Sequence, residues 1–299
     1  MGWNARLDLH YRREADRTVG EHHHVGPLRV LKALYPEGPG ICHHVVVHPP
    51  AGIAAGDRLT LQGRLDPGVH ALLTTPGATR FYRCDGDTGV QDIHLRVGEG
   101  ARLEWTPGET LVYDGAQAHN RMRFDLAPGA RMIGWEVTAL GLPAAHRPFL
   151  RGALHQRLSV VVQDGRGAEV PWLEQGRLAA DDHRLLDSPL GLGGHRTLAT
   201  MWLACGDVAP DDSLRAALIE ARQQALTVVD AWRNQWPAPD AAAGAGRPVG
   251  VTLAMPHVLV LRALGERVEP LMQLLRAMRS AWRAPLLGVP SADPRVWST

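Results

Sequence analysis

The stretch Leu72-Leu-Thr-Thr-Pro-Gly-Ala-Thr-Arg-Phe-Tyr-Arg83 decides how this chain folds. Its first four residues are apolar or β-branched and predict a strand. Pro76-Gly77 is a turn signal, because proline presets φ at one turn position and glycine accepts a positive φ at the next. Thr79–Arg83 predicts a second strand with Arg80 and Tyr82 on one face. Taken alone, the stretch is typical of a hairpin with solvent-exposed arginines.

The same succession of a turn and a strand recurs roughly every thirty residues. Gly68, Gly100 and Gly129 each precede a strand, and two of these units end in Thr75-Pro76-Gly77 and Thr106-Pro107-Gly108. Such a period predicts stacked β layers in which each layer covers the apolar face of its neighbour. We therefore predict a mostly β fold, a β-helix-like solenoid. The alternative is the repeated hairpins of an ordinary β-sandwich.

Alternating or β-branched runs predict further strands at residues 3–9, 28–34, 42–48, 58–65, 154–162 and 197–204. Arg12–Glu21 is polar and predicts a turn, and Asp164–Gly167 predicts a hairpin turn. Helical spacing occurs only in the last third, where two α-helices begin near Asp211-Asp212-Ser213 and at Glu269-Pro270. We expect one domain over residues 1–299: β-rich 1–208, a helix at 213–236, an exposed linker at 237–249, and a hairpin plus helix at 250–299.

Composition limits the classes of function. The 299 residues carry a net charge of +1, so no strong field for nucleic acid is expected. The first twenty residues are charged, and no run reaches the ~18 apolar residues that span a membrane. Three widely separated cysteines, Cys42, Cys84 and Cys205, argue against a disulfide framework. These features predict a cytoplasmic protein without nucleic-acid or membrane partners.

The standard catalytic motifs are missing from the sequence. It contains no dinucleotide-binding glycine motif, no phosphate loop and no Gly-x-Ser-x-Gly elbow. Fifteen histidines are present, and imidazole binds nickel, zinc and copper well. Only His44 and His48 share one strand face at a useful separation, so they are the candidate metal ligands. A solvated polar face is the simpler interpretation of these histidines.

Carboxylates occur inside apolar strand contexts, where burying them unpaired is costly. The residues concerned are Asp57, Glu104, Glu109, Asp114 and Glu136. We expect them to pair with Arg80 or Arg83, or to line a wet cavity.

Several strings together resemble the urease accessory protein D family (UreD, called UreH in some species). The matching pieces are Leu34–Gly38, His48–Gly52 through Gly56–Leu59, Leu72–Arg83, Leu103–Trp105 with Glu109-Thr110, Asp114–Ala116, Ile133–Glu136 and Pro294–Trp297. The family more often has lysine where Arg80 stands, serine where Cys84 stands, and diglycine at Ala51-Gly52 and Ala55-Gly56. These differences weaken any assignment of specific chemistry to those positions.

The resemblance implies a mostly β, helix-like stack with two α-helices and a non-enzymatic role. It implies that the chain binds apo-urease and recruits UreF and the GTPase UreG, so that nickel and carbon dioxide build the dinickel centre. It also implies an internal water-filled passage, with nickel in transit and no tightly bound cofactor. The residues that would line this passage or contact partners are Asp57, Thr79, Arg80, Tyr82, Arg83, Glu109, Asp114, Glu136 and Glu174.

Two other functions remain open at this point. One is a metal-dependent hydrolase on a β-stack, using His44, His48 and acidic residues. The other is a purely structural adaptor through which no nickel passes. Scattered carboxylates favour a passage, because nickel in transit needs ligands weak enough to release it.

Overall fold

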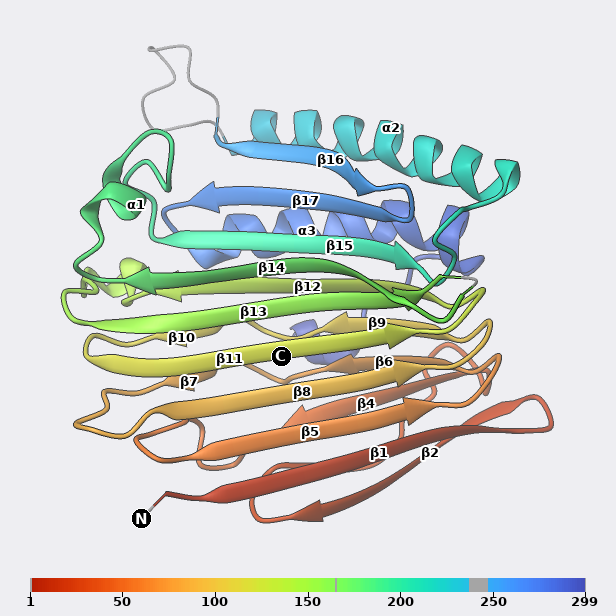
Figure 1. Ribbon diagram of the computed structural model, residues 1–299, viewed down its shortest axis with the longest axis horizontal. Helices are drawn as coiled ribbons and strands as arrows, with labels where there is room; N and C mark the ends of the chain where they lie inside the picture. The colour runs from red at the N-terminus through yellow and green to blue at the C-terminus, as the bar shows by residue number, and fades with distance from the viewer. Residues whose placement is uncertain (1, 165, 237–246, 299) are drawn as a thin grey trace.

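The computed structural model describes residues 2–164, 166–236 and 247–298, which form two facing β-sheets (Figure 1). Sheet I has the order β14-β13-β11-β8-β5-β1-β2. Its strands are β1 (Asn4–Glu14), β2 (Arg17–Val25), β5 (Arg58–Leu65), β8 (Gly89–Val97), β11 (Ala116–Leu126), β13 (Gly152–Gln163) and β14 (Glu169–Ala179).

Sheet II has the order β16-β17-β15-β12-β9-β6-β4-β3, with β7 and β10 attached beside β12. Its strands are β3 (Arg29–Val30), β4 (Ile41–Val47), β6 (His70–Thr74), β7 (Thr79–Phe81), β9 (Arg102–Thr106), β10 (Thr110–Val112), β12 (Arg131–Leu140), β15 (Thr197–Cys205), β16 (Val249–Met255) and β17 (Val258–Gly265).

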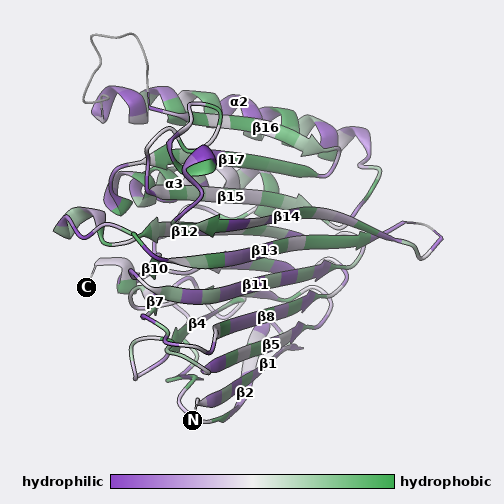
Figure 2. Ribbon diagram, turned by 60° about the vertical axis from the view of Figure 1, so that its left-hand side comes forward, coloured by the Kyte–Doolittle hydropathy of each residue, from purple (hydrophilic) through white to green (hydrophobic). Residues whose placement is uncertain are grey.

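The chain alternates between the two sheets and so winds a β-solenoid of about four turns. In sheet I, β5, β8, β11 and β13 are parallel neighbours, and in sheet II the same holds for β4, β6, β9 and β12. Each turn therefore hydrogen-bonds to the turns before and after it, as the thirty-residue period predicts. Figure 2 shows hydrophobic and hydrophilic residues alternating along the strands of sheet I, because one face is buried and the other is exposed.

The stretch Leu72–Arg83 is a corner of the solenoid and not a hairpin. β6 pairs with β4 and β9, whereas β7 pairs with β10. The two Thr-Pro-Gly turns stack on each other: Thr75 Oγ1 accepts a hydrogen bond from Gly108 N at 2.8 Å and donates one to Gly77 O at 2.8 Å. A Cβ on Gly108 would lie 2.7 Å from Gly77 O, so this close approach requires glycine.

Helices cover the face of sheet II that points away from sheet I. They are α2 (Asp212–Gln235) and α3 (Val268–Trp282), which confirm the two predicted helices, and the short α1 (His183–Asp187) lies elsewhere. Asp211 caps α2 by accepting a hydrogen bond from Leu214 N at 2.8 Å. The strands β12, β15 and β17 of sheet II are therefore buried on both faces, with one apolar cluster between the sheets and a second between these strands and the helices.

After α3 the chain forms a single π-helical turn (Arg283–Leu287) and a 3-10 helix (Arg295–Ser298), and another 3-10 turn spans Pro143–Ala145. Two further sequence predictions were wrong. Arg12–Glu21 is mostly strand, because β1 and β2 pair up to Glu14 and Arg17. The strand expected at 28–34 is only Arg29–Val30. Residues 237–246 of the expected linker lie outside the described residues, and no helix in the described part of the chain could span a membrane.

Candidate functional site: a polar cavity inside the solenoid

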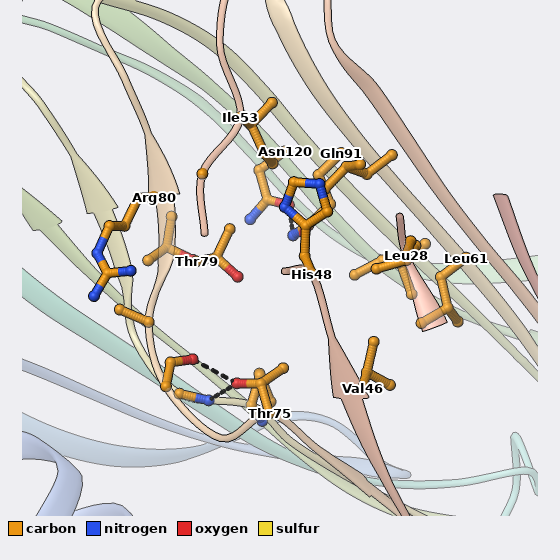
Figure 3. A pocket seen from close by; sticks show the side chains of 18 of the residues that line it. Leu28, Val46, His48, Ile53, Leu61, Thr75, Thr79, Arg80, Gln91 and Asn120 are labelled. Carbon is orange, nitrogen blue, oxygen red and sulfur yellow. Dashed lines mark hydrogen bonds between the residues drawn. The ribbon is translucent and has the colours of Figure 1, made fainter. Parts of the chain in front are cut away.

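A cavity of about 210 Å³ lies between the two sheets. Much of its wall is apolar, from Leu59, Leu61, Ile93, Trp105 and Met122. Figure 3 shows the hollow, with His48, Asn120 and Gln91 along one part of its wall and Thr79 and Arg80 along another. The stacked Thr-Pro-Gly turns form the remaining wall and separate the cavity from a groove beside α3.

Glu136 on β12 is the buried carboxylate of this cavity, with only 4% of its surface exposed. Asn120 Nδ2 donates a hydrogen bond to its Oε1 at 2.6 Å, and Gln156 Nε2 donates one to its Oε2. Gln91 Nε2 in turn donates to Asn120 Oδ1 at 3.1 Å. The carboxylate is thus held by neutral amides, and no ion pair with a described residue compensates its charge.

Burial raises the pKa of Glu136 to about 7, although the hydrogen bonds from Gln156 and Asn120 act in the opposite direction. Desolvation disfavours the charged form, and two amide donors offset this only in part. Near neutral pH the side chain therefore titrates between its neutral and its charged form.

The mouth of the cavity is formed by β7 and by the loop after His48. Arg80 Nη1 donates to Ala51 O at 3.2 Å, which ties β7 to the loop after His48. A Cβ on Gly52 would lie 2.1 Å from the ring of Tyr82, so glycine is required for this loop to pack there. Burial also lowers the pKa of His48, which favours the neutral imidazole, although the charge of Asp57 acts in the opposite direction.

The candidate residues lie in different places. Thr79, Arg80 and Glu136 line the cavity, as does His48. Glu109 lines the neighbouring groove, which also includes Trp297. The remaining candidates do not line either space. Asp57 accepts hydrogen bonds from Trp3 N and Ala54 N, and Asp114 accepts them from Leu150 N and Arg151. Arg83 donates a hydrogen bond to Asp85, the ring of Tyr82 packs on that of Tyr113, and Glu174 forms an ion pair with Arg262.

His44 does not join His48 at the cavity. Its Nδ1 is hydrogen-bonded to the hydroxyl of Tyr11 at 2.7 Å, and burial lowers its pKa to about 4. Within residues 2–164, 166–236 and 247–298, no three histidine, cysteine, aspartate or glutamate side chains are grouped so that they could hold a metal ion.

A second carboxylate, Glu104 on β9, is fully buried on the opposite face of sheet II. Arg279 Nε donates to its Oε2 at 2.7 Å, Arg283 Nη2 to its Oε1 at 3.0 Å, and His70 Nε2 lies 2.9 Å from Oε1. Hydrogen bonding from His70 and the charges of Arg279, His70 and Arg283 outweigh desolvation and lower the pKa of Glu104 to about 2. The expected pairing with Arg80 or Arg83 was wrong, because the partners come from α3 and the turn after it.

Sequence reasoning missed the three amides that surround Glu136. Gln91, Asn120 and Gln156 occupy inward-facing positions on β8, β11 and β13, where the neighbouring inward positions are apolar. Amides at inward positions of three successive parallel strands would have indicated a polar site inside the solenoid, because in-register strands place such residues side by side.

The fold and the cavity define a class of protein: two-sheet β-solenoids with a helical flank and an internal polar cavity. The family described as "UreD urease accessory protein" matches residues 4–298. Relatives named urease accessory protein UreD, from Methylibium petroleiphilum, Leptothrix cholodnii and Variovorax paradoxus, are 53%, 48% and 46% identical over the full length of both chains. The chain therefore belongs to the UreD family, and its role is that of a urease accessory protein.

Proposed function

We propose that the chain is a non-enzymatic scaffold in the cytoplasm that binds apo-urease, recruits UreF and the GTPase UreG, and passes nickel through its cavity. The observation that carries the proposal is the wall around Glu136. One carboxylate held by neutral amides offers a divalent cation a single charged ligand, with neutral oxygens nearby. Such a set binds nickel weakly enough to release it, unlike a closed cage of histidine and cysteine.

The metal-dependent hydrolase receives no support from the geometry. His44 and His48 do not belong to any metal-binding group among the described residues, and Nδ1 of His44 is hydrogen-bonded to Tyr11.

Asp57 has a structural role in the loop that follows His48. Because both of its carboxylate oxygens accept backbone hydrogen bonds, Asp57→Ala should mainly alter the conformation of that loop and of the N-terminal strand.

The test is the substitution Glu136→Gln, which keeps the shape and removes the charge. The chain is co-expressed with UreF, UreG and the apo-urease subunits, and the complex is recovered on this chain. We expect an intact assembly with urease nickel content and activity lowered by about tenfold, the lower end of the loss of about 10–100-fold that follows mutation of polar groups around a metal. The matched control is Glu99→Gln, an exposed carboxylate remote from the cavity lining.

Normal urease nickel content in the Glu136→Gln complex would exclude the passage. The remaining hypothesis would then be the structural adaptor through which no nickel passes. Failure to recover any partner with the unmodified chain, together with full urease activation in its absence, would exclude the scaffold itself.

A further inference from the structure

The outward face of sheet I, which points away from the cavity, carries two neighbouring rows of side chains paired in register across β5, β8, β11, β13 and β14. The first row consists of Arg58, Val90, His119, His155 and Arg177. The second row consists of Thr60, Asp92, Arg121, Arg157 and Gln175. Both rows face outward, because the alternate residues of β11, Ala118, Asn120 and Met122, are buried inside the solenoid.

Positive charge gathers in these two rows, in a set of side chains that we call the basic patch: Arg58, His119, Arg121, His155, Arg157 and Arg177. Asp92 is the one carboxylate in the two rows. It accepts a hydrogen bond from Arg58, and its Oδ1 lies 3.5 Å from Arg121 Nη1. The basic patch therefore has a surplus of positive charge, although the whole chain carries a net charge of only +1.

Two arginines of the basic patch have no carboxylate partner. Arg157 and Arg177 are exposed, and neither forms an ion pair with another described residue. Arg157 Nη1 donates a hydrogen bond to the amide oxygen of Gln175 at 3.3 Å. Both guanidinium groups are thus available to an anion from outside the chain.

The two histidines report on the local electric field. Their rings are in contact, with centroids 4.7 Å apart, and Arg121 Nη2 donates a hydrogen bond to His119 Nδ1 at 3.0 Å. Burial lowers the pKa of His119, and the charges of His155, Arg121 and Arg58 lower it further, whereas Asp92 acts in the opposite direction. Since the nearby positive charges outnumber the negative one, this part of the surface attracts anions.

The surface is also hollowed beside the basic patch. A depression of about 250 Å³ has Asp92, Arg121, Arg157 and Ser159 among its lining residues. A guanidinium group binds a carboxylate through two parallel hydrogen bonds, so a carboxylate that enters the depression can pair with Arg157.

We propose that the basic patch is a docking surface for an acidic surface of a partner protein, with one partner carboxylate bound by Arg157 in the depression. The proposal rests on the proposed function, because the partner is one of the proteins that the scaffold assembles. A protein fits better than a nucleic acid. Asp92 would repel a continuous phosphate backbone, whereas an acidic protein surface can place a lysine or arginine beside it.

The test reverses the two unpaired charges with Arg157→Glu and Arg177→Glu together. The full chain is co-purified with UreF, UreG and the apo-urease subunits, and the complex held on this chain is washed with increasing NaCl. We expect one partner to leave the double variant at a lower salt concentration. At constant ionic strength its Kd should rise by about tenfold, the effect of losing two exposed charge contacts.

The matched control is the double variant Arg29→Glu and Arg222→Glu. Both arginines are exposed outside sheet I, on β3 and α2, and neither forms an ion pair with another described residue. Its partners should leave at the same salt concentration as those of the unmodified chain.

Asp92→Asn should change the binding in the opposite direction. It removes the carboxylate that repels an acidic partner, so the Kd should fall by about twofold. If Asp92 merely fixed the local structure, its substitution would instead weaken binding. Equal salt elution of the unmodified chain and the Arg157→Glu, Arg177→Glu variant would overturn the proposal.

A second measurement separates this proposal from the scaffold itself. Fluorescence anisotropy of the full chain with a labelled deca-glutamate peptide should show binding that the Arg157→Glu, Arg177→Glu variant weakens. Tighter binding of an oligothymidylate of equal length would overturn the proposal in favour of a nucleic acid. Dimers that this variant alone dissociates would identify a second copy of the chain as the occupant, which also overturns it. If the unmodified chain captures no partner but binds the peptide, the scaffold fails and the acidic ligand remains.

Discussion

Glu104 and Glu136 are both buried glutamates of sheet II, yet they lie on opposite faces and behave in opposite ways. Glu104 faces the helical flank and is held by His70 and two arginines, which keep its pKa near 2. Glu136 faces the interior of the solenoid, is held by neutral groups, and has a pKa near 7. The difference shows that burial alone does not decide the state of a carboxylate. The charge of the groups packed against it does.

Each face also serves a different purpose. On the outer face, Arg279 and Arg283 reach from the C-terminal segment to Glu104, and they also donate to Ala292 O and Pro290 O. This network fixes the helices and the C-terminal residues to the solenoid. On the inner face an uncompensated carboxylate costs folding free energy, a cost that the proposed passage of a cation would explain.

The largest expected effect comes from breaking the outer network. Glu104→Gln leaves the guanidinium groups of Arg279 and Arg283 buried without their shared counter-charge. We expect the free energy of unfolding to fall by about 3–5 kcal/mol, the usual cost of removing one partner of a buried ion pair. Urea unfolding followed by tryptophan fluorescence measures it, with the exposed Glu99→Gln as control. A loss below about 1 kcal/mol, the size found for exposed ion pairs, would show that the ion pairs of Glu104 contribute little to stability.

The next prediction concerns how stability depends on pH, a dependence that has opposite signs for Glu136 and Glu104. Its pKa is raised from 4.5 to about 7 in the folded state, so the folded chain binds the proton more tightly. Folding is therefore favoured below pH 4.5, and this contribution is lost progressively as the pH rises to 7. Glu136→Gln removes the penalty and should stabilise the chain at pH 8 by up to about 3 kcal/mol.

Unfolding curves at pH 5 and pH 8 test this sign. The advantage of Glu136→Gln over the unmodified chain should be small at pH 5 and full at pH 8. For Glu104, whose pKa is lowered to about 2, stability is instead present above pH 4.5 and is lost as the pH falls toward 2. Equal pH profiles for the unmodified chain and Glu136→Gln would show that Glu136 carries no such penalty.

The smallest effect tests how the C-terminal residues are held on the outer face. Trp297 Nε1 donates to Thr74 Oγ1 at 3.0 Å, and its ring packs on Trp135 with centroids 5.3 Å apart. Trp297→Phe keeps an aromatic ring and removes the donor, so we expect a loss of about 1 kcal/mol. The same unfolding assay measures it. Thr74→Val removes the acceptor and also the hydrogen bond that Thr74 Oγ1 donates to Thr106 O at 2.6 Å, so its loss should be larger, and adding Trp297→Phe to it should change little.

The sequence by itself determined the repeat and therefore the solenoid. Glycines before each strand and two Thr-Pro-Gly turns are local features, and a period near thirty residues leaves few arrangements other than stacked turns. It also determined both long helices, because Asp211 is a capping residue and the apolar residues after it follow helical spacing. The family followed from ordered strings that span most of the chain.

Only the tertiary structure decided which carboxylate does what. Glu104 and Glu136 have similar neighbours in sequence, Leu-Glu-Trp and Trp-Glu-Val, and both were expected to pair with Arg80 or Arg83 or to line a cavity. Their partners differ in kind and in place: Asn120 and Gln156 lie 16 and 20 residues from Glu136, whereas Arg279 is 175 residues from Glu104. Strand parity shows that a residue faces inward or outward, but it does not show what packs against that face. The charge of the groups packed against a carboxylate sets its pKa, and only the tertiary fold brings those groups into contact with it.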